Sequence, residues 1–146
     1  MRIVEAESLC DNQLRDIKGL IKELASDIVA TEEMVLATVA NPYSHLFVVM
    51  DDDEKVMGCA TLCVYDSPTG KKASVEDVVV SYAFRGKHLG RQLMEYLLKY
   101  AKENFGDVEL HLTSNPKRVV ANAMYQSLGF MKKETNAYVM RVKKGD

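Results

Sequence analysis

The segment from residue 75 to residue 91 constrains the fold of this chain more than any other. It begins with an apolar run, continues through a short basic turn that contains two glycines, and passes directly into a pattern of regularly spaced leucines. A short apolar run before a turn signal indicates a strand, and apolar residues at helical spacing indicate an amphipathic helix. The sequence therefore predicts a strand, a tight turn and the N-terminus of a helix in immediate succession.

The turn, Arg85-Gly86-Lys87-His88-Leu89-Gly90, has the features of an anion site. The first backbone N–H groups of a helix have no partner within the helix, and the helix dipole favours negative charge beside them. The same dipole disfavours cations at this end of a helix. The presence of several basic residues here therefore favours the binding of an external anion. The glycine spacing matches neither a P-loop nor a dinucleotide fingerprint. The alternatives are a phosphate site of another kind and a solvated basic helix start.

Two adjacent carboxylates, Glu76 and Asp77, interrupt the apolar strand. Strict alternation along a strand places Glu76 on one face with Val78 and Val80, and Asp77 on the other face. An unpaired buried carboxylate is costly. Each one is therefore expected either to be paired for structural reasons or to face a cleft, where a raised pKa suits a general base. Position in the strand leaves both readings open.

The remaining pattern predicts one α/β or α+β domain over residues 1–146. Helices are expected over roughly residues 11–28, from a Thr31 cap to the residue before Asn41, from residue 89 to about 105, and from an Asn115 cap to Gly129. Strands are expected near residues 2–6, 45–50, 55–65, 72–80, 108–113, 130–133 and 137–142. This order predicts a mixed, mostly antiparallel sheet of about six to seven strands flanked by about four helices.

Composition excludes several functional classes. A net charge of −2 over 146 residues gives no reason to expect a nucleic-acid partner. The longest apolar run, residues 46–50, is too short to span a membrane, and the N-terminus has no signal-peptide pattern. Three cysteines favour a reducing compartment, so a cytoplasmic location is expected. Cys59 and Cys63 lack a matching pair of histidines, so no metal site is expected, and His111 is expected to be packed or solvated.

A third element completes the pattern. Arg118, Asn122 and Tyr125 lie on one face of the last expected helix, which ends at Leu128-Gly129-Phe130. The strand, the basic turn and this helix, in this order, resemble the GNAT superfamily of acetyl-CoA-dependent N-acetyltransferases. The resemblance covers roughly residues 45–142. His88 departs from it, because the family usually has glycine at that position of the turn.

The resemblance implies roles for particular residues. The backbone of Val78, Val79 and Val80 is implied to bind the pantetheine arm and the acetyl group. The backbone N–H groups of Arg85, Gly86, Lys87, His88, Leu89, Gly90 and Arg91 are implied to bind the pyrophosphate of acetyl-CoA, with Asn122 as a further cofactor contact. Glu76 is expected to act as the general base and Tyr125 to protonate the departing thiolate. Asp77, Tyr43, His45 and Ser114 are candidates for the acceptor site.

The predicted function is therefore the direct transfer of an acetyl group from acetyl-CoA to a primary amine of a small molecule, in a ternary complex and without a metal. The short connection over residues 132–136 favours a small acceptor. The acidic strand also looks like that of glucosamine-6-phosphate N-acetyltransferases, which makes an amino-sugar phosphate one alternative. A protein or peptide acceptor is another, and a non-catalytic acyl-CoA sensor is a remote one. A homodimer is possible, because dimers are common in the family.

Overall fold

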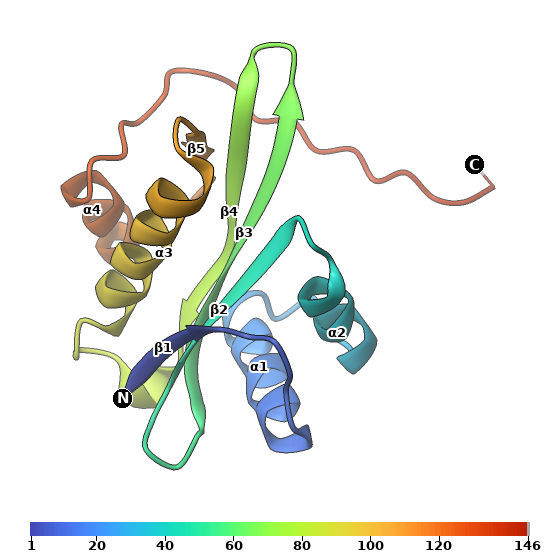
Figure 1. Cartoon of the computed structure of the whole chain (residues 1–146), viewed down its shortest axis with the longest axis vertical. Coiled ribbons are helices and arrows are strands. Elements are labelled where there is room, and N and C mark those ends of the chain that lie inside the picture. Colours follow the sequence, from blue (N-terminus) through green and yellow to red (C-terminus); the bar gives the residue numbers. More distant parts are fainter. Residues whose placement is uncertain (146) are drawn as a thin grey trace. The chain divides into compact units, whose positions relative to one another are not determined.

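A five-stranded sheet with the strand order β1-β2-β3-β4-β5 organises the first part of the chain (Figure 1). The strands are β1 (Arg2–Glu5), β2 (Ser44–Met50), β3 (Val56–Ser67), β4 (Gly70–Val80) and β5 (Glu109–His111). The first four pair in antiparallel fashion, and β5 joins β4 in parallel. The mixed, mostly antiparallel α+β class is confirmed, with five strands among the described residues in place of six or seven.

The computed structural model describes residues 1–145, and the chain divides into two compact units, Met1–Thr113 and Ser114–Asp146. The first unit contains the sheet, α1 (Asp11–Leu24), α2 (Glu32–Ala40), the 3-10 turn η1 (Tyr82–Phe84) and α3 (Leu89–Phe105). The second unit contains α4 (Val119–Ser127). The expectation of a single domain over the whole chain stays a prediction.

Helices α1 and α2 cover one face of the sheet (Figure 1). Leucine and isoleucine side chains repeat at helical spacing along α1, and they pack on every second residue of β2. The resulting cluster includes Leu14, Ile17 and Leu20 from α1, Val35 from α2, and Leu46, Val48 and Met50 from β2. Burying this stripe is what fixes α1 to the sheet, because each fully buried aliphatic side chain contributes about 1.5–3 kcal/mol.

The ends of these two helices follow local chemistry. The Thr31 hydroxyl accepts a hydrogen bond from the N–H of Met34 at 3.2 Å, which confirms the predicted cap of α2. Helix α1 ends at Leu24, earlier than the predicted residue 28. The cause lies at Ala25, which is extended (φ −143°, ψ 91°) and whose N–H closes the last turn on the carbonyl of Ile21.

Helix α3 covers the opposite face. Its core residues Leu93 and Leu97 are fully buried. Two of its tyrosines pack edge-on against Phe47 of β2, with ring centroids 5.6 Å (Tyr96) and 5.0 Å (Tyr100) away. Phe47 lies between the β2 residues that pack under α1 and α2, so β2 contributes alternate residues to the two cores.

The structure corrects the sequence prediction for β4. Glu76 lies opposite Thr61, whereas Val79 lies opposite Cys59, so the two residues between them on β4, Asp77 and Val78, lie opposite the single residue Ala60 of β3. This is a β-bulge, and its extra residue reverses the alternation of the strand. Glu76 and Val79 therefore share the face covered by α1 and α2, and the predicted grouping of Glu76 with Val78 and Val80 is wrong.

The C-terminal part departs most from the prediction. Strand β5 covers only Glu109–His111, and α4 begins at Val119 in place of residue 116. The Asn115 side chain accepts a hydrogen bond from the N–H of Lys117 at 2.9 Å, so residues 115–118 form a turn before the helix begins. No strand forms over 130–142 within the described chain, and Met131 is 90 % exposed. Apolar alternation makes a strand only where a neighbouring strand supplies hydrogen bonds.

Candidate functional site

The sheet forks between β4 and β5. Their parallel pairing covers three residue pairs and ends where Ser74 lies opposite His111. Strand β4 continues beyond this point to Val80. The two carboxylates and the valines of the sequence prediction therefore lie on a stretch of β4 that the pairing with β5 does not reach. A fork of this kind gives a ligand access to the backbone of a strand inside a sheet.

The bulge places Asp77 in an unusual backbone conformation. Its φ of +52° lies in the left-handed region, which non-glycine residues seldom adopt, although Asp and Asn tolerate it better than most. Partial desolvation, and after it the neighbouring charge of Glu76, raise the pKa of the Asp77 carboxyl above its ordinary value. Backbone strain and a raised pKa both concentrate at functional sites.

Glu76 lies beside the fork, on the face of α1 and α2, and its side chain is exposed. Its Oε1 accepts a hydrogen bond from the Ser74 hydroxyl at 2.5 Å. This bond orients the carboxylate and leaves Oε2 for a ligand. An exposed, oriented carboxylate beside a fork can accept a proton from a bound amine.

A histidine that sequence reasoning set aside lies next to this carboxylate. His111 is the register partner of Ser74, and paired residues of neighbouring strands share a face. Its Nε2 is buried without a hydrogen-bond partner among the described residues, although it lies 3.4 Å from the Glu109 carboxylate. No motif marked His111, because its place beside Ser74 depends on the pairing of two strands 37 residues apart (111 − 74).

The basic turn follows β4 directly. The N–H of Ser81 donates to the carbonyl of Met57 at 2.9 Å, which fixes the start of η1 to β3. Arg85 Nε donates to the carbonyl of Val80 at 3.2 Å, and its guanidinium lies 3.7 Å from the centre of the Tyr82 ring. These contacts hold the turn against the end of the strand.

Helix α3 begins right after this turn. His88 takes the left-handed conformation at its N-cap (φ +59°, ψ 24°). Within residues 1–145, no hydrogen bond engages the N–H groups of Gly86, Lys87 or His88, and all three residues are exposed. Free N–H groups, a helix N-terminus and the neighbouring basic side chains together favour a bound anion. The His88 backbone therefore takes up the conformation in which glycine is usual.

Asn122 and Tyr125 belong to the second unit. The Asn122 side chain donates to the carbonyl of Asn115 at 3.0 Å, which ties α4 to the preceding turn. Tyr125 is buried and packs edge-on against Phe130, with ring centroids 6.1 Å apart. Burial raises the pKa of the Tyr125 phenol, and Arg118 offsets part of that rise. Ser114 begins this unit, and its hydroxyl is buried without a partner among the described residues.

Two of the predicted acceptor residues lie elsewhere. His45 packs under α3, on the face opposite Glu76, and its Nδ1 lies 2.6 Å from Glu5 and 3.2 Å from the Tyr100 hydroxyl. Tyr43 is 69 % exposed and immediately precedes β2. The structure therefore does not bring His45 together with Glu76.

The thiol of Cys59 is fully buried in the core under α1. Burial, and to a smaller extent the charge of Asp77, raise its pKa to about 12, so the thiol stays protonated and unreactive. Among residues 1–145, no three His, Cys, Asp or Glu side chains are arranged to hold a metal ion. Over the same residues, no helix has the length and apolarity needed to cross a membrane.

Comparison with known proteins identifies the family. The model of the acetyltransferase (GNAT) family matches residues 14–130, so this chain belongs to that family. No curated protein sequence matches. Members of the family use acetyl-CoA as co-substrate, and the general activity of this chain is acyl transfer.

Solved structures agree on the fold. A protein from Agrobacterium tumefaciens assigned to the acetyltransferases matches with a TM-score of 0.82 at 23 % identity, over 97 % of this chain and 100 % of that one. An acetyltransferase from Trypanosoma brucei matches with 0.76 at 19 % identity, over 96 % and 99 %. An aminoglycoside 6'-N-acetyltransferase from Acinetobacter haemolyticus matches with 0.73 at 22 % identity, over 99 % and 100 %. At these identities the likeness concerns the fold alone.

Proposed function

We propose that this protein is an N-acetyltransferase that moves the acetyl group of acetyl-CoA to a primary amine of a small molecule. The observation that carries the proposal is the fork after Ser74, where β4 runs past its neighbour and leads directly into a turn with free N–H groups at the start of α3. An extended ligand with an anionic end fits this arrangement. Its extended part can bind the part of β4 that is not paired with β5, and its anionic end can bind the turn that follows β4.

In this proposal the pyrophosphate of acetyl-CoA binds at residues 85–91. The backbone N–H groups from Gly86 to Gly90 contact its oxygens, and Arg85, Lys87 and Arg91 supply positive charge. The backbone of Val78, Val79 and Val80 contacts the pantetheine arm and the acetyl group. Asn122 is a further cofactor contact. Supporting the anion end, the turn has three exposed N–H groups with no partner among the described residues.

The proposed chemistry needs one base and one acid. The acceptor ammonium loses a proton to Glu76, directly or through water, and the amine nitrogen then attacks the thioester carbon. A backbone N–H of β4 stabilises the oxyanion of the tetrahedral intermediate. When that intermediate collapses, the C–S bond breaks, Tyr125 donates its proton to the departing thiolate, and the nitrogen loses its second proton to the Tyr125 phenolate or to water, which leaves the neutral amide. The raised pKa of Tyr125 keeps the phenolic proton in place at neutral pH.

Asp77 is the second carboxylate of the proposed site. Its raised pKa and its position one residue beyond Glu76 support a place near the acceptor amine. Two adjacent carboxylates favour an acceptor that carries positive charge. A phosphorylated acceptor would bring its own negative charge close to these two carboxylates. An amino-sugar phosphate is therefore the alternative acceptor that a screen should compare with non-phosphorylated amines.

A screen that measures release of free thiol tests the proposal. The purified protein is incubated with acetyl-CoA and, separately, with alkylamines, polyamines, amino sugars, amino-sugar phosphates and peptides. We expect turnover with a non-phosphorylated small amine. Turnover with peptides alone would replace the small-molecule acceptor by a protein acceptor. If calorimetry detects no binding of acetyl-CoA, the proposed co-substrate is wrong for this chain.

Two substitutions test the assigned roles. Glu76→Gln and Tyr125→Phe are each expected to lower kcat by about 10²–10⁴-fold, the usual contribution of a positioned acid or base. Matched controls are Glu103→Gln, at an exposed position of α3, and Tyr138→Phe, at an exposed position of the second unit. Unchanged rates at every pH in both site variants would show that other groups move these protons.

A cytoplasmic location and a homodimer complete the proposal. Light scattering of the purified chain measures its mass in solution, and a mass of one chain at all concentrations would exclude the dimer. Fractionation of cells that express the chain tests the location.

A further inference from the structure

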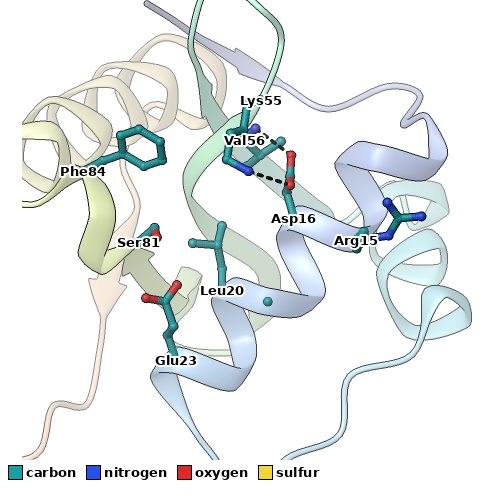
Figure 2. Close-up of a pocket in the computed structure, with 9 residues that line it drawn as sticks. Arg15, Asp16, Leu20, Glu23, Lys55, Val56, Ser81 and Phe84 are labelled. Atoms are coloured by element: carbon teal, nitrogen blue, oxygen red, sulfur yellow. Dashed lines mark hydrogen bonds and ion pairs between the residues drawn. The ribbon is translucent and has the colours of Figure 1, made fainter.

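A hollow lies in the first unit, between α1, the start of β3 and η1 (Figure 2). Its volume is about 210 Å³, enough for a small organic molecule. The residues that matter for its chemistry are Asp16, Gly19, Leu20, Glu23, Ser81 and Phe84. None of the residues placed in the acetyl-transfer site lines it.

One residue on the wall of the hollow, Gly19, is a glycine at a position where neither steric crowding nor backbone conformation requires one. Gly19 lies in the interior of α1, where glycine costs about 1 kcal/mol relative to alanine. A Cβ at Gly19 would meet no other atom within 4 Å, and the φ of the residue does not require glycine. Gly58 is different, because a Cβ there would lie 2.9 Å from the carbonyl oxygen of Val79. Gly19 therefore leaves this part of the wall without a side chain, and a larger residue there would have room to occupy the hollow.

Of the charged side chains that border the hollow, all but one carboxylate are paired with other groups or directed away from it. Asp16 is already engaged, because its Oδ1 lies 3.3 Å from Lys55 Nζ and its Oδ2 accepts the N–H of Val56 at 3.1 Å. Arg15 also borders the hollow, but its guanidinium extends away from the other labelled residues (Figure 2) and donates to Asn12. The two cations are thus either neutralised or directed outward.

Glu23 supplies that carboxylate. Its Oε1 accepts the N–H of Tyr82 at 2.9 Å, and within residues 1–145 its Oε2 makes no hydrogen bond or ion pair. In Figure 2 the carboxylate points from α1 toward Ser81, with Leu20 and Phe84 on the neighbouring walls. The hydroxyl of Ser81 is a second possible acceptor. A carboxylate and a hydroxyl beside an aliphatic and an aromatic wall match an ammonium group on a short apolar chain.

We propose that this hollow is a binding site for a small primary ammonium ion that carries a short alkyl chain. Its nitrogen donates to Glu23 and Ser81, while its chain lies against Leu20 and Phe84 and occupies the space above Gly19. The site is separate from the acetyl-transfer site and does not depend on the proposed activity.

An NMR titration of the isotope-labelled full chain, without acetyl-CoA, tests the site. The probe is n-butylammonium chloride, with sodium butyrate and 1-butanol as anionic and neutral counterparts at equal ionic strength. The reporter is the amide of Tyr82, whose N–H is bound by Glu23. We expect the Tyr82 signal to shift in a saturable way with n-butylammonium, and at least tenfold less response at equal concentration with butyrate or 1-butanol. No saturable shift, or an equal response to all three probes, would overturn the proposal.

Substitutions locate the bound probe. Gly19→Leu places a side chain on the wall of the hollow, where its Cβ meets no atom within 4 Å, and Glu23→Gln removes the charge while it keeps an oxygen for the Tyr82 N–H. Each is expected to weaken n-butylammonium binding at least tenfold. As controls, Ala37→Leu adds bulk and Glu33→Gln removes a carboxylate charge at exposed positions outside the hollow, and both are expected to leave binding unchanged. Glu76→Gln should also leave binding unchanged. Loss of binding in Glu76→Gln but not in Gly19→Leu would place the probe in the acceptor site and refute this inference.

Discussion

The two glycines at positions 19 and 58 should respond with opposite signs to the same substitution. A Cβ at Gly58 would lie 2.9 Å from the Val79 carbonyl oxygen, 3.1 Å from Cγ1 of Val49 and 3.2 Å from Cγ2 of Val80. The closest contact is with backbone, so β3 and β4 must separate locally for alanine to fit. Such overpacking costs about 1–3 kcal/mol, and the lower entropy of the unfolded alanine chain returns about 0.4–1 kcal/mol.

The net effect of Gly58→Ala is therefore a loss of about 1–2 kcal/mol. For a domain of this size, 1 kcal/mol corresponds to roughly 2–4 °C, so the Tm should fall by about 2–8 °C. Gly19→Ala meets no atom and improves helix propensity, so it should raise stability by up to about 1 kcal/mol. Urea denaturation followed by circular dichroism measures both values. Shifts of the same sign, or a Gly58→Ala protein as stable as the parent, would refute the steric argument.

Three further predictions concern titration and capping. Asp77 has a raised pKa, so the folded state holds its proton more tightly than the unfolded chain, and stability falls as the pH rises above the ordinary value of 3.8. Asp77→Asn should therefore raise the Tm at pH 7 and give no such gain below pH 3.8, as measured by thermal melts under the two conditions. An equal gain in Tm under both conditions would show that ionisation of Asp77 is not the cause. Burial, and then the hydrogen bond and charge of Glu5, raise the pKa of Tyr100 to about 12 from 10.0, so stability should fall between these values as the unfolded chain ionises first. Tyr100→Phe should flatten this alkaline fall in urea titrations, and an unchanged slope would exclude Tyr100 as its source. Thr31→Ala removes the cap of α2 and should cost about 1 kcal/mol, whereas Thr31→Ser should cost little; equal losses in both would show that the hydroxyl is not the stabilising group.

The parts of the fold that local signals determine could be predicted from the sequence. The Thr31 cap, the turn before β4 and the leucines of α3 each act within a few residues, and the structure agrees with the predictions made from them. The expected strands near 130–133 and 137–142 carried the right alternation, but a strand also needs a partner, and no local pattern reports one. The turn at Asn115 was misjudged because its side chain can cap either a helix or a turn.

The candidate site divides in the same way. The basic turn and the two carboxylates could be identified from the sequence, because charged residues are unusual within an apolar strand and cations are unusual at the start of a helix. The bulge at Asp77 could not be predicted from the sequence, because it depends on how β3 and β4 pair with each other. The neighbourhood of His111 and Ser74 and the hollow above Gly19 depend on tertiary pairing as well.

The bulge has a consequence for how β4 tolerates change. Because of the extra residue, the strand consists of two alternating series that are out of step by one position, one ending at Glu76 and one resuming at Val79. The buried positions Ala73, Val75 and Val79 are therefore all odd-numbered, although Val79 lies on the opposite face of the sheet from Val75, and a scan of single substitutions should find charge rejected at these three positions. Deleting Asp77 would leave Val78 opposite Ala60 and Val79 opposite Cys59, so one regular alternation would run through the strand and Val79 would keep its place in the core beneath α1. The bulge therefore inserts the Asp77 carboxyl into β4 without changing which residues of either half face the core.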